Sequence, residues 1–316
     1  MAYALAVRAY ANAKSSDYEA CLKDTSVVIE QGENDEGIDS IRAQALHERG
    51  RSEESVEFAK SRTLRGVHKA EWNCWIGAVY SEVGDYENAE VYLQASIELD
   101  PSVVDAWLHQ ANLGFHRGDL SASKVALQRA IELDASEQLI LQCQAILAHQ
   151  ERRFDDAIDL NSQLLEISDD DMFRCVALTN RAYAWHALTN YARASDDYEE
   201  ALLCQSLTST RWRHVAWFLS TCPEATYRDG PRAIELMRRE RDRCQVRASV
   251  CWAIYAAAHA ESGKFNEAIE LQKTYEKRLL EDQQTGSVSN LDVQIPSTAM
   301  KLYEQQKPLH CDLLLL

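Results

Sequence analysis

A few histidine and aspartate residues have the types and spacing of metal ligands. His109 and His116 stand seven residues apart and could share one helix face as metal ligands. Polar surface positions are the commoner role for such histidines, and we interpret both in that way. Asp169, Asp170 and Asp171 could attract calcium, but the run lacks the glycine and the terminal glutamate of an EF-hand loop. We therefore expect a solvated acidic loop and no bound metal or cofactor.

Cys222 is a candidate nucleophile. Pro223 follows it and His214 lies nearby in the sequence, but no residue that would orient the imidazole is identifiable. We therefore interpret Cys222 as packing at a helix end. The glycine patterns of phosphate and dinucleotide sites, the zinc-protease pattern and the nucleophile-elbow pattern do not occur in the sequence. These observations predict a protein that is not an enzyme.

The formal net charge is −17, which argues against nucleic-acid binding because phosphate recognition needs clustered lysine and arginine. Many arginines between Arg211 and Arg247 run against this trend, but Glu224, Asp229 and Glu235 stand among them. We interpret this stretch as a solvated helix face with salt bridges. The chain contains few glycines and prolines and is rich in strong helix formers, so the composition predicts an all-α protein.

The nine cysteines are odd in number and none forms a C-x-x-C pair. Reduced, buried thiols in a cytoplasmic protein fit this pattern best, and neither a disulfide framework nor a zinc site is expected. The chain opens in a helical pattern without a basic region and an apolar core of a secretory signal. No apolar run approaches the roughly 20 residues that a membrane span needs. We therefore expect a cytoplasmic protein with no membrane segment.

Small residues recur along the chain in two series, and the first four intervals of both are 34 residues. The first series is Ala9, Ala43, Gly77, Ala111, Ala145, Ala182, Ala216 and Ala256. The second series is Cys21, Ser55, Ala89, Ser123, Ala157, Ala194, Ala233 and Ala268. Three places before each member of the second series stands a residue that is aromatic in five of eight cases, preceded by turn formers. Two antiparallel helices of about 13 residues with short connections fill such a period, and the small residues let neighbouring helices approach closely.

Two departures from this period indicate longer connections. Three extra residues before the sixth repeat coincide with the acidic loop at 168–171, which offers N-caps for a helix that begins near Met172. The seventh repeat gains five residues between its helices, at 222–231. There, Pro223 should end the first helix and Pro231 suits the start of the second.

The period and layout resemble those of tetratricopeptide repeats, most clearly in the unit EWNCWIGAVYSEVGDYENAEVYLQASIELDP at 71–101. The resemblance implies an all-α fold, a right-handed α-solenoid of about eight helix–turn–helix repeats with a short C-terminal capping helix. We place the repeats near 2–35, 36–69, 70–103, 104–137, 138–174, 175–208, 209–248 and 249–281. The second is the weakest match, because serines stand at positions 52 and 55. Residues 282–296 should form a polar linker, and residues 297–316 the capping helix and tail.

A narrower resemblance covers the seventh repeat, AWFLSTCPEATYRDGPRAIEL, at 216–236. It is similar to a pattern close to A-W-L-L-A-T-C-P-D followed by R-D-G in a bacterial subgroup of tetratricopeptide proteins, from which Phe218 and Ser220 depart. In that subgroup such repeats often form the end of longer proteins. This implies an alternative function, as a regulatory or substrate-recruiting helical segment of a larger bacterial enzyme. The catalytic domain, of a kinase or glycosyltransferase, would then lie outside this chain.

In this architecture the first helices line a concave face, and residues one and four places after the small position should point into it. Aromatic, imidazole and amide side chains in such a groove suit the recognition of a peptide segment. An alternative interpretation of Tyr183 and Trp217 is packing between repeats. The candidate groove residues are Tyr10, Gln44, His47, Asn112, Phe115, His149, Tyr183, His186, Arg213 and Trp217.

The charge of the predicted groove indicates the kind of partner. A clamp for two carboxylates needs lysine, arginine and asparagine, whereas the groove offers Asn112 and Arg213 beside acids such as Glu71 and Asp105. An acidic solenoid favours a partner with a basic or aromatic segment. The sequence therefore predicts a non-catalytic scaffold that binds a peptide or protein segment in the concave groove. Self-association through uncapped ends is a further expectation.

Overall fold

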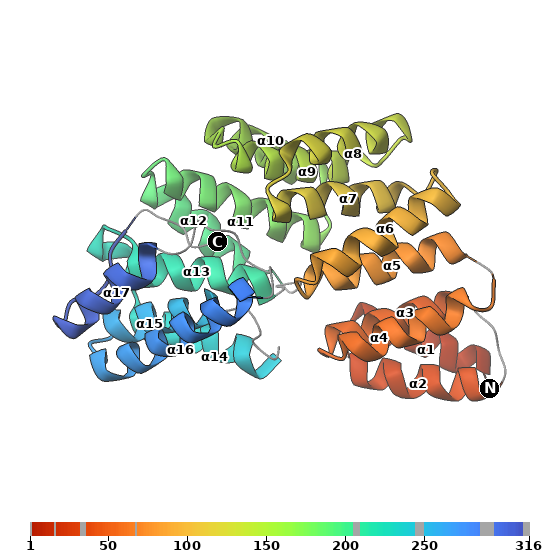
Figure 1. The fold of residues 1–316 in the computed structure, drawn as a ribbon, viewed down its shortest axis with the longest axis horizontal. Coiled ribbons are helices and arrows are strands. Elements are labelled where there is room, and N and C mark those ends of the chain that lie inside the picture. Colours follow the sequence, from red (N-terminus) through yellow and green to blue (C-terminus); the bar gives the residue numbers. More distant parts are fainter. Residues whose placement is uncertain are drawn as a thin grey trace. The chain divides into compact units, whose positions relative to one another are not determined.

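The computed structural model describes residues 2–15, 17–31, 36–66, 68–204, 209–243, 250–284 and 294–311. Within these ranges the chain forms seventeen α-helices, one short 3-10 helix and no strand. The fold is all-α, as the composition predicts, and consecutive helices form antiparallel pairs in the manner of a helical-repeat solenoid (Figure 1).

Met1–Leu113 forms one compact unit. Its helices are α1 (Ala2–Lys14), α2 (Tyr18–Glu30), α3 (Glu36–Glu48), α4 (Ser52–Thr63), α5 (Lys69–Glu82), α6 (Tyr86–Leu99) and the first part of α7 (Val104–Arg117). Each second helix packs against the first helix of its own repeat, and α2 and α4 also contact the first helix of the next repeat. This is the packing that a 34-residue period predicts.

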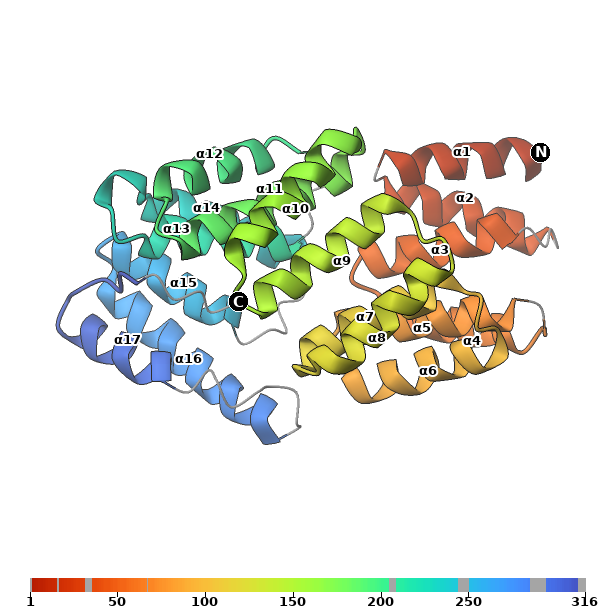
Figure 2. The ribbon, with the colours of Figure 1, turned by 90° about the horizontal axis from the view of Figure 1, so that it is seen from above.

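Gly114–Leu316 forms the second compact unit. It begins with α8 (Leu120–Glu132), α9 (Glu137–Gln150), α10 (Phe154–Ile167), α11 (Asp171–Ala187) and α12 (Tyr191–Ala201). It continues with α13 (Ser209–Thr221), the 3-10 helix η1 (Ala225–Tyr227), α14 (Gly230–Arg243), α15 (Val250–Glu261), α16 (Phe265–Gln284) and α17 (Gln294–Glu304). The first helices α9, α11 and α13 lie side by side, as do α13 and α15 (Figure 2).

The small residues of both series are all buried, which explains their spacing. At Gly77 a Cβ atom would lie 2.6 Å from Cγ of Leu93 and 3.1 Å from its backbone nitrogen, so α5 and α6 touch at this point. Ser55 fits the same close contact in the second repeat, because its hydroxyl donates a hydrogen bond to the carbonyl of Ala43 at 2.7 Å. The polar residue that makes this repeat a weak match is therefore satisfied in the core.

Every second helix begins at the residue that the repeat pattern singles out, namely Tyr18, Ser52, Tyr86, Leu120, Phe154, Tyr191, Gly230 and Phe265. Aspartates cap several of these helices. Asp17, Asp85 and Asp119 each accept a hydrogen bond from the backbone N–H three residues later, at 3.1, 3.1 and 2.9 Å. The capping satisfies an N–H group that has no partner inside the helix.

In six repeats the turn between the two helices holds a left-handed residue five places before the second small position. Gly50, Gly84, Gly118 and Gly263 hold it with φ between 73° and 83°. In the fifth and sixth repeats Arg152 and Thr189 stand at the equivalent position, both with φ 58°. Because a Cβ atom is unfavourable in this region, these two residues hold a strained conformation that the repeat geometry imposes.

The first and sixth repeats each hold an arginine–aspartate ion pair in which the aspartate is buried. In the first repeat Arg8 donates from Nε and Nη2 to Asp24 at 2.7 and 2.6 Å. In the sixth repeat Arg181 donates from Nε and Nη2 to Asp197 at 2.8 and 2.7 Å. Both pairs join residues 16 positions apart, one on each helix of a repeat. The hydrogen bonds from Arg8 hold the pKa of Asp24 below its usual value.

The C-terminal elements differ from their expected bounds. The helix α16 continues to Gln284, past the expected end at 281, because glutamate and glutamine continue a helix as readily as leucine. The helix α17 begins at Gln294 and not at 297, since Pro296 is tolerated in a first helical turn. Residues 285–293 of the expected linker lie outside the described residues. The helix α17 packs against α16 and buries Ala299 and Tyr303.

Candidate protein-binding surface

Three ring side chains form a continuous row across unit 2. The rings of His149 on α9 and Tyr183 on α11 meet edge to face, with centroids 5.0 Å apart and planes at 90°. Tyr183 also meets His214 on α13, with centroids 5.8 Å apart and planes at 73°. All three residues are half-buried, and both ring nitrogens of His149 are buried. Edge-to-face geometry is the favourable arrangement for such rings.

The positions of these residues within their repeats explain why the rings meet. His149 lies four places after Ala145, whereas Tyr183 lies one place after Ala182 and His214 two places before Ala216. Because α9, α11 and α13 lie side by side, these positions bring the three rings to one surface.

The turn between α9 and α10 adds a fourth ring. Phe154, the first residue of α10, has its ring centroid 6.2 Å from that of His149 and 6.4 Å from that of Tyr183. The guanidinium of Arg152, an exposed residue of the same turn, lies 5.9 Å from the centre of the Phe154 ring. We call His149, Phe154, Tyr183 and His214 the His–Tyr patch. The sequence rule missed Phe154 and His214, because it considered only two positions of each first helix.

Two residues of the patch, His149 and Tyr183, are uncharged near neutral pH. Burial lowers the pKa of His149 to about 4, with the Asn180 backbone acting in the opposite direction. Burial also raises the pKa of Tyr183, with the charge of Arg152 acting in the opposite direction. His149 and Tyr183 are therefore neutral near pH 7, and Arg152 lies at the edge of the patch.

Arg213 lies next to His214 on α13 and is half-buried. Its Nη1 is 4.0 Å from Sγ of Cys251, and its Nε is buried without a hydrogen-bond partner. A guanidinium that keeps a donor unused in this way is costly unless a further acceptor reaches it. Arg213 is therefore a second cation beside the patch.

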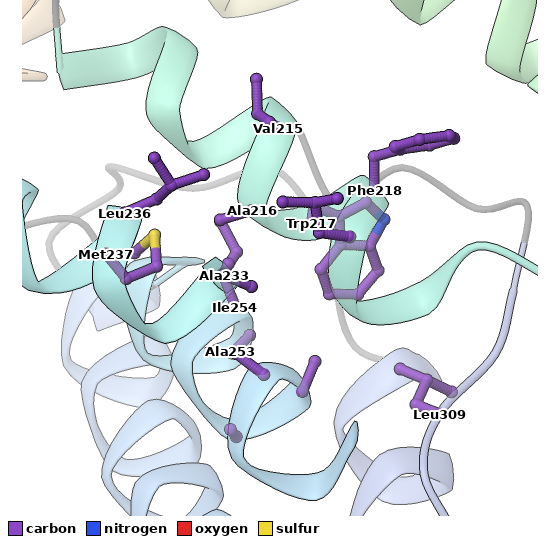
Figure 3. Close-up of a cluster of buried hydrophobic side chains, with 14 of the residues drawn as sticks. Val215, Ala216, Trp217, Phe218, Ala233, Leu236, Met237, Ala253, Ile254 and Leu309 are labelled. Atoms are coloured by element: carbon purple, nitrogen blue, oxygen red, sulfur yellow. The ribbon is translucent and has the colours of Figure 1, made fainter. Parts of the chain in front are cut away.

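Three of the predicted groove residues are not accessible, and for these the prediction is wrong. Trp217 and His186 are fully buried, and Phe115 is 5% exposed. Trp217 lies in the large core cluster around α13 and α15, to which the tail residue Leu309 also belongs (Figure 3). The tail is held there by the backbone N–H of Cys311, which donates to the carbonyl of Thr221 at 2.9 Å. The C-terminal tail thus contributes to the core around a position that the repeat rule treats as open.

His186 packs inside the core of the neighbouring repeats. Its ring centroid lies 5.8 Å from that of Tyr191 and 5.1 Å from that of Phe218. The same rule fails for several small groove positions, since Ser220, Ala257 and Ala260 are also buried.

The remaining predicted residues lie in unit 1, apart from the patch in sequence. Tyr10 and Gln44 are exposed, on α1 and α3, and Asn112 is half-buried on α7. His47 is held within unit 1: its Nε2 lies 2.6 Å from Glu82 and its Nδ1 3.0 Å from Oγ of Ser52. Within unit 2, the structure brings the predicted residues His149, Tyr183 and Arg213 into one candidate surface.

The loop at 222–231 is organised by one arginine. Arg228 donates from Nη1 to the carbonyls of Cys222 and Pro223 at 2.8 and 2.9 Å, and from Nε to Glu261 at 2.9 Å. The backbone N–H of Asp229 donates to the carbonyl of Leu219 at 2.9 Å. These bonds close the loop onto the end of α13, which gives a structural reason for the R-D-G part of the motif.

The described residues hold no cluster of three or more histidine, cysteine, aspartate or glutamate side chains that could bind a metal ion. Eight cysteines are described and all are free, six of them buried. Burial raises the pKa of the Cys74 and Cys143 thiols to about 12. Thiols of this kind pack as small apolar groups. No helix in the described ranges has the length and apolar character to cross a membrane.

Comparisons with known proteins give the same fold. Residues 70–103 match the family model of the tetratricopeptide repeat. A tetratricopeptide repeat protein from Parabacteroides merdae superposes with a TM-score of 0.55 at 15% identity, over 81% of this chain and 98% of that one. A chain of the APC/C hetero-tetramer Cut9–Hcn1 superposes with a TM-score of 0.65 at 15% identity, over 94% of this chain and 54% of that one. A search of curated proteins finds no significant sequence match.

Proposed function

We propose that this tetratricopeptide-repeat protein is a non-catalytic scaffold that holds a peptide or protein segment against the His–Tyr patch. The observation that carries the proposal is the continuous, half-buried row of rings on α9, α11 and α13. Aromatic side chains and arginines supply most of the binding energy in protein interfaces. A surface that combines four rings with two arginines at its edge has this composition.

The patch favours an apolar or aromatic segment of the partner. Neutral His149 and Tyr183 present ring edges and faces, and a further aromatic ring can extend their edge-to-face row. Arg152 and Arg213 disfavour a basic residue directly at this point and favour a backbone carbonyl or a carboxylate beside the aromatic group. We therefore expect the bound segment of the partner to place an aromatic residue on the patch.

The experiment is affinity capture with the intact chain and with Tyr183→Ala. The matched control is Tyr92→Ala on α6, because Tyr92 is also half-buried and stacks on another ring, Tyr80, with centroids 5.7 Å apart. A protein captured by the parent and by Tyr92→Ala, but lost with Tyr183→Ala, supports the proposal. Equal capture by all three chains rejects it.

Self-association is a second candidate function, favoured by one face of α1. Tyr3, Val7 and Tyr10 follow one another at helical spacing and are 83%, 51% and 40% exposed. Such a stripe is suited to an isologous contact with the same stripe of a second copy. Sedimentation over a hundredfold concentration range tests this: Val7→Glu should abolish a dimer that the parent forms. A parent that stays monomeric over the whole range rejects it.

A further inference from the structure

A cavity of about 500 Å³ opens between α15 and α16 in unit 2. These two helices are antiparallel and lie side by side (Figure 2). From α15 the described lining includes Trp252, Tyr255 and His259, and from α16 it includes Glu267, Glu270 and Leu271. None of the four residues of the His–Tyr patch lines it, although the lining residue Cys251 lies 4.0 Å from Nη1 of Arg213 beside that patch.

The two walls differ in chemistry because of helical spacing. Trp252, Tyr255 and His259 stand at positions i, i+3 and i+7 and share one face of α15, whereas the alanines of this helix are buried on its other side. Glu267 and Glu270 stand at i and i+3 and share one face of α16. One wall is therefore aromatic and the other carries two carboxylates.

The aromatic wall is ordered by contacts within α15. The rings of Tyr255 and His259 lie 5.6 Å apart with planes at 35°, and Nδ1 of His259 lies 2.9 Å from the carbonyl oxygen of Tyr255. The indole N–H of Trp252 is buried and has no hydrogen-bond partner. A buried donor of this kind is satisfied when a ligand brings an acceptor, such as a peptide carbonyl.

The acidic wall is only partly neutralised. Glu270 pairs with Lys273 at 2.8 Å, and both side chains are exposed. Glu267 makes no ion pair with any residue in the described part of the chain. The indole of Trp252 already attracts a cation within the protein, since the guanidinium of Arg278 lies 5.7 Å from its ring centre.

We propose that this cavity binds the arginine side chain of a basic segment in a partner protein. A guanidinium is planar, so it stacks on an aromatic ring and presents its N–H fork to carboxylates in the same plane. Glu267 and Glu270 supply those carboxylates, and Trp252 donates its N–H to the backbone of the bound segment. The net charge of −17 attracts a basic segment over longer range. The site goes beyond the proposed function, because it does not use the His–Tyr patch.

The test uses the full chain and three capped peptides of the sequence Gly-X-Gly-X-Gly, in which X is arginine, lysine or citrulline. Binding is followed by calorimetry and by the NMR signal of the Trp252 indole N–H, assigned with Trp252→Phe. The arginine peptide should bind at least fivefold more tightly than the lysine peptide and should shift the Trp252 signal. The citrulline peptide, which is neutral, should not bind.

Two double variants separate the cavity from the overall charge. Glu267→Gln with Glu270→Gln should weaken the arginine peptide at least tenfold. Asp159→Asn with Asp196→Asn removes the same charge at exposed positions of α10 and α12 and should leave its affinity within twofold. All four residues are exposed, so neither variant should unfold the chain. Equal weakening by both variants, or equal affinity for lysine and arginine, overturns the proposal.

A third variant distinguishes this site from the His–Tyr patch. Tyr183→Ala should not change the affinity for the arginine peptide, whatever it does to capture of a protein partner. Loss of arginine-peptide binding with Tyr183→Ala, but not with the cavity variant, overturns the assignment of the arginine to the cavity.

Discussion

Arg228 and Glu261 form an ion pair between residues 33 positions apart, with Nε 2.9 Å from Oε1. The pair ties the loop after α13 to the end of α15, and the other oxygen of Glu261 lies 2.8 Å from Nε2 of His310 in the tail. Both partners are largely buried, with side chains 13% and 16% exposed. The Arg228–Glu261 pair thus connects the loop, a neighbouring repeat and the C-terminal tail.

We expect Arg228→Met to destabilise the fold by about 1–3 kcal/mol, because it removes the ion pair of the largely buried Glu261 and leaves two loop carbonyls without their donor. Thermal and urea unfolding measure the change. Arg232→Met is the control: Arg232 pairs with Glu199, but the side chains are 40% and 48% exposed, so its loss should cost about 0–1 kcal/mol. Equal melting temperatures for the two variants would contradict this account of the loop.

The close contacts of the repeats predict a sharp difference between two neighbouring alanines of α12. Ala194 is fully buried at a small position, whereas Ala192 is exposed. Ala194→Leu should destabilise the fold by about 1–3 kcal/mol through overpacking, and Ala192→Leu should change stability by less than about 0.5 kcal/mol. Urea denaturation of both variants measures this. Similar midpoints would show that the repeat register is wrong.

The strained turn of the sixth repeat predicts a stabilising change. Thr189 has φ 58°, a conformation in which a β-branched residue is unfavourable. Thr189→Gly should raise the free energy of unfolding by about 0.5–1 kcal/mol, after the entropy that glycine adds to the unfolded chain. Gly84→Thr, at the equivalent turn, should lower it by about 1 kcal/mol, since a Cβ there meets no atom and only the conformation costs. If both changes lower the free energy of unfolding, strain at Thr189 does not determine the stability of this turn.

The lowered pKa of His149 predicts that the free energy of unfolding falls as the pH is lowered. Its pKa is about 4 in the folded chain, below the usual value of 6.5, so the unfolded chain binds a proton first as pH falls. The stability contributed by neutral His149 is complete above pH 6.5 and is lost progressively between about pH 6.5 and 4. His149→Phe should remove this loss and be more stable than the parent by about 2 kcal/mol at pH 5 relative to pH 8. His116→Phe, at an exposed position, should leave the loss of stability between pH 6.5 and 4 as it is in the parent. Parallel pH profiles for parent and His149→Phe would refute the shift.

The helix pairs could be predicted from the sequence because one small residue in each helix is required by contact between helices. Gly77 shows the reason: Leu93 occupies the space that a side chain at this position would need, so no larger residue fits. Because each repeat has such a position, small residues recur in the sequence every 34 residues. The seventh repeat differs at the first residue of its second helix. Gly230 replaces an aromatic residue there, because a Cβ would lie 2.9 Å from the carbonyl oxygen of Ala258 on α15.

The accessible surface could not be predicted in the same way. The repeat rule assigns Trp217 and Tyr183 to the same row, yet Trp217 is fully buried and Tyr183 is half-buried. Trp217 belongs to a core cluster that includes residues far away in the sequence, such as Leu309 in the tail, which no local spacing reveals. His214 was missed because it stands two places before Ala216, outside the two positions of each first helix that the rule considers, although its ring meets that of Tyr183. Position within a repeat therefore predicts burial between helices better than it predicts exposure.

The central claim is that the His–Tyr patch binds a protein partner, and the dissociation constant of that partner for Tyr183→Ala tests it most directly. The partner is the protein that the parent chain captures, purified and measured by calorimetry. Tyr183→Ala should weaken binding at least tenfold, since truncating an interface aromatic costs about 2 kcal/mol and 1.4 kcal/mol is one decade of affinity. Tyr92→Ala should bind within twofold of the parent, and both variants should keep the helical circular dichroism of the parent. If Tyr183→Ala, folded, binds the partner as tightly as the parent does, the patch is not the binding surface.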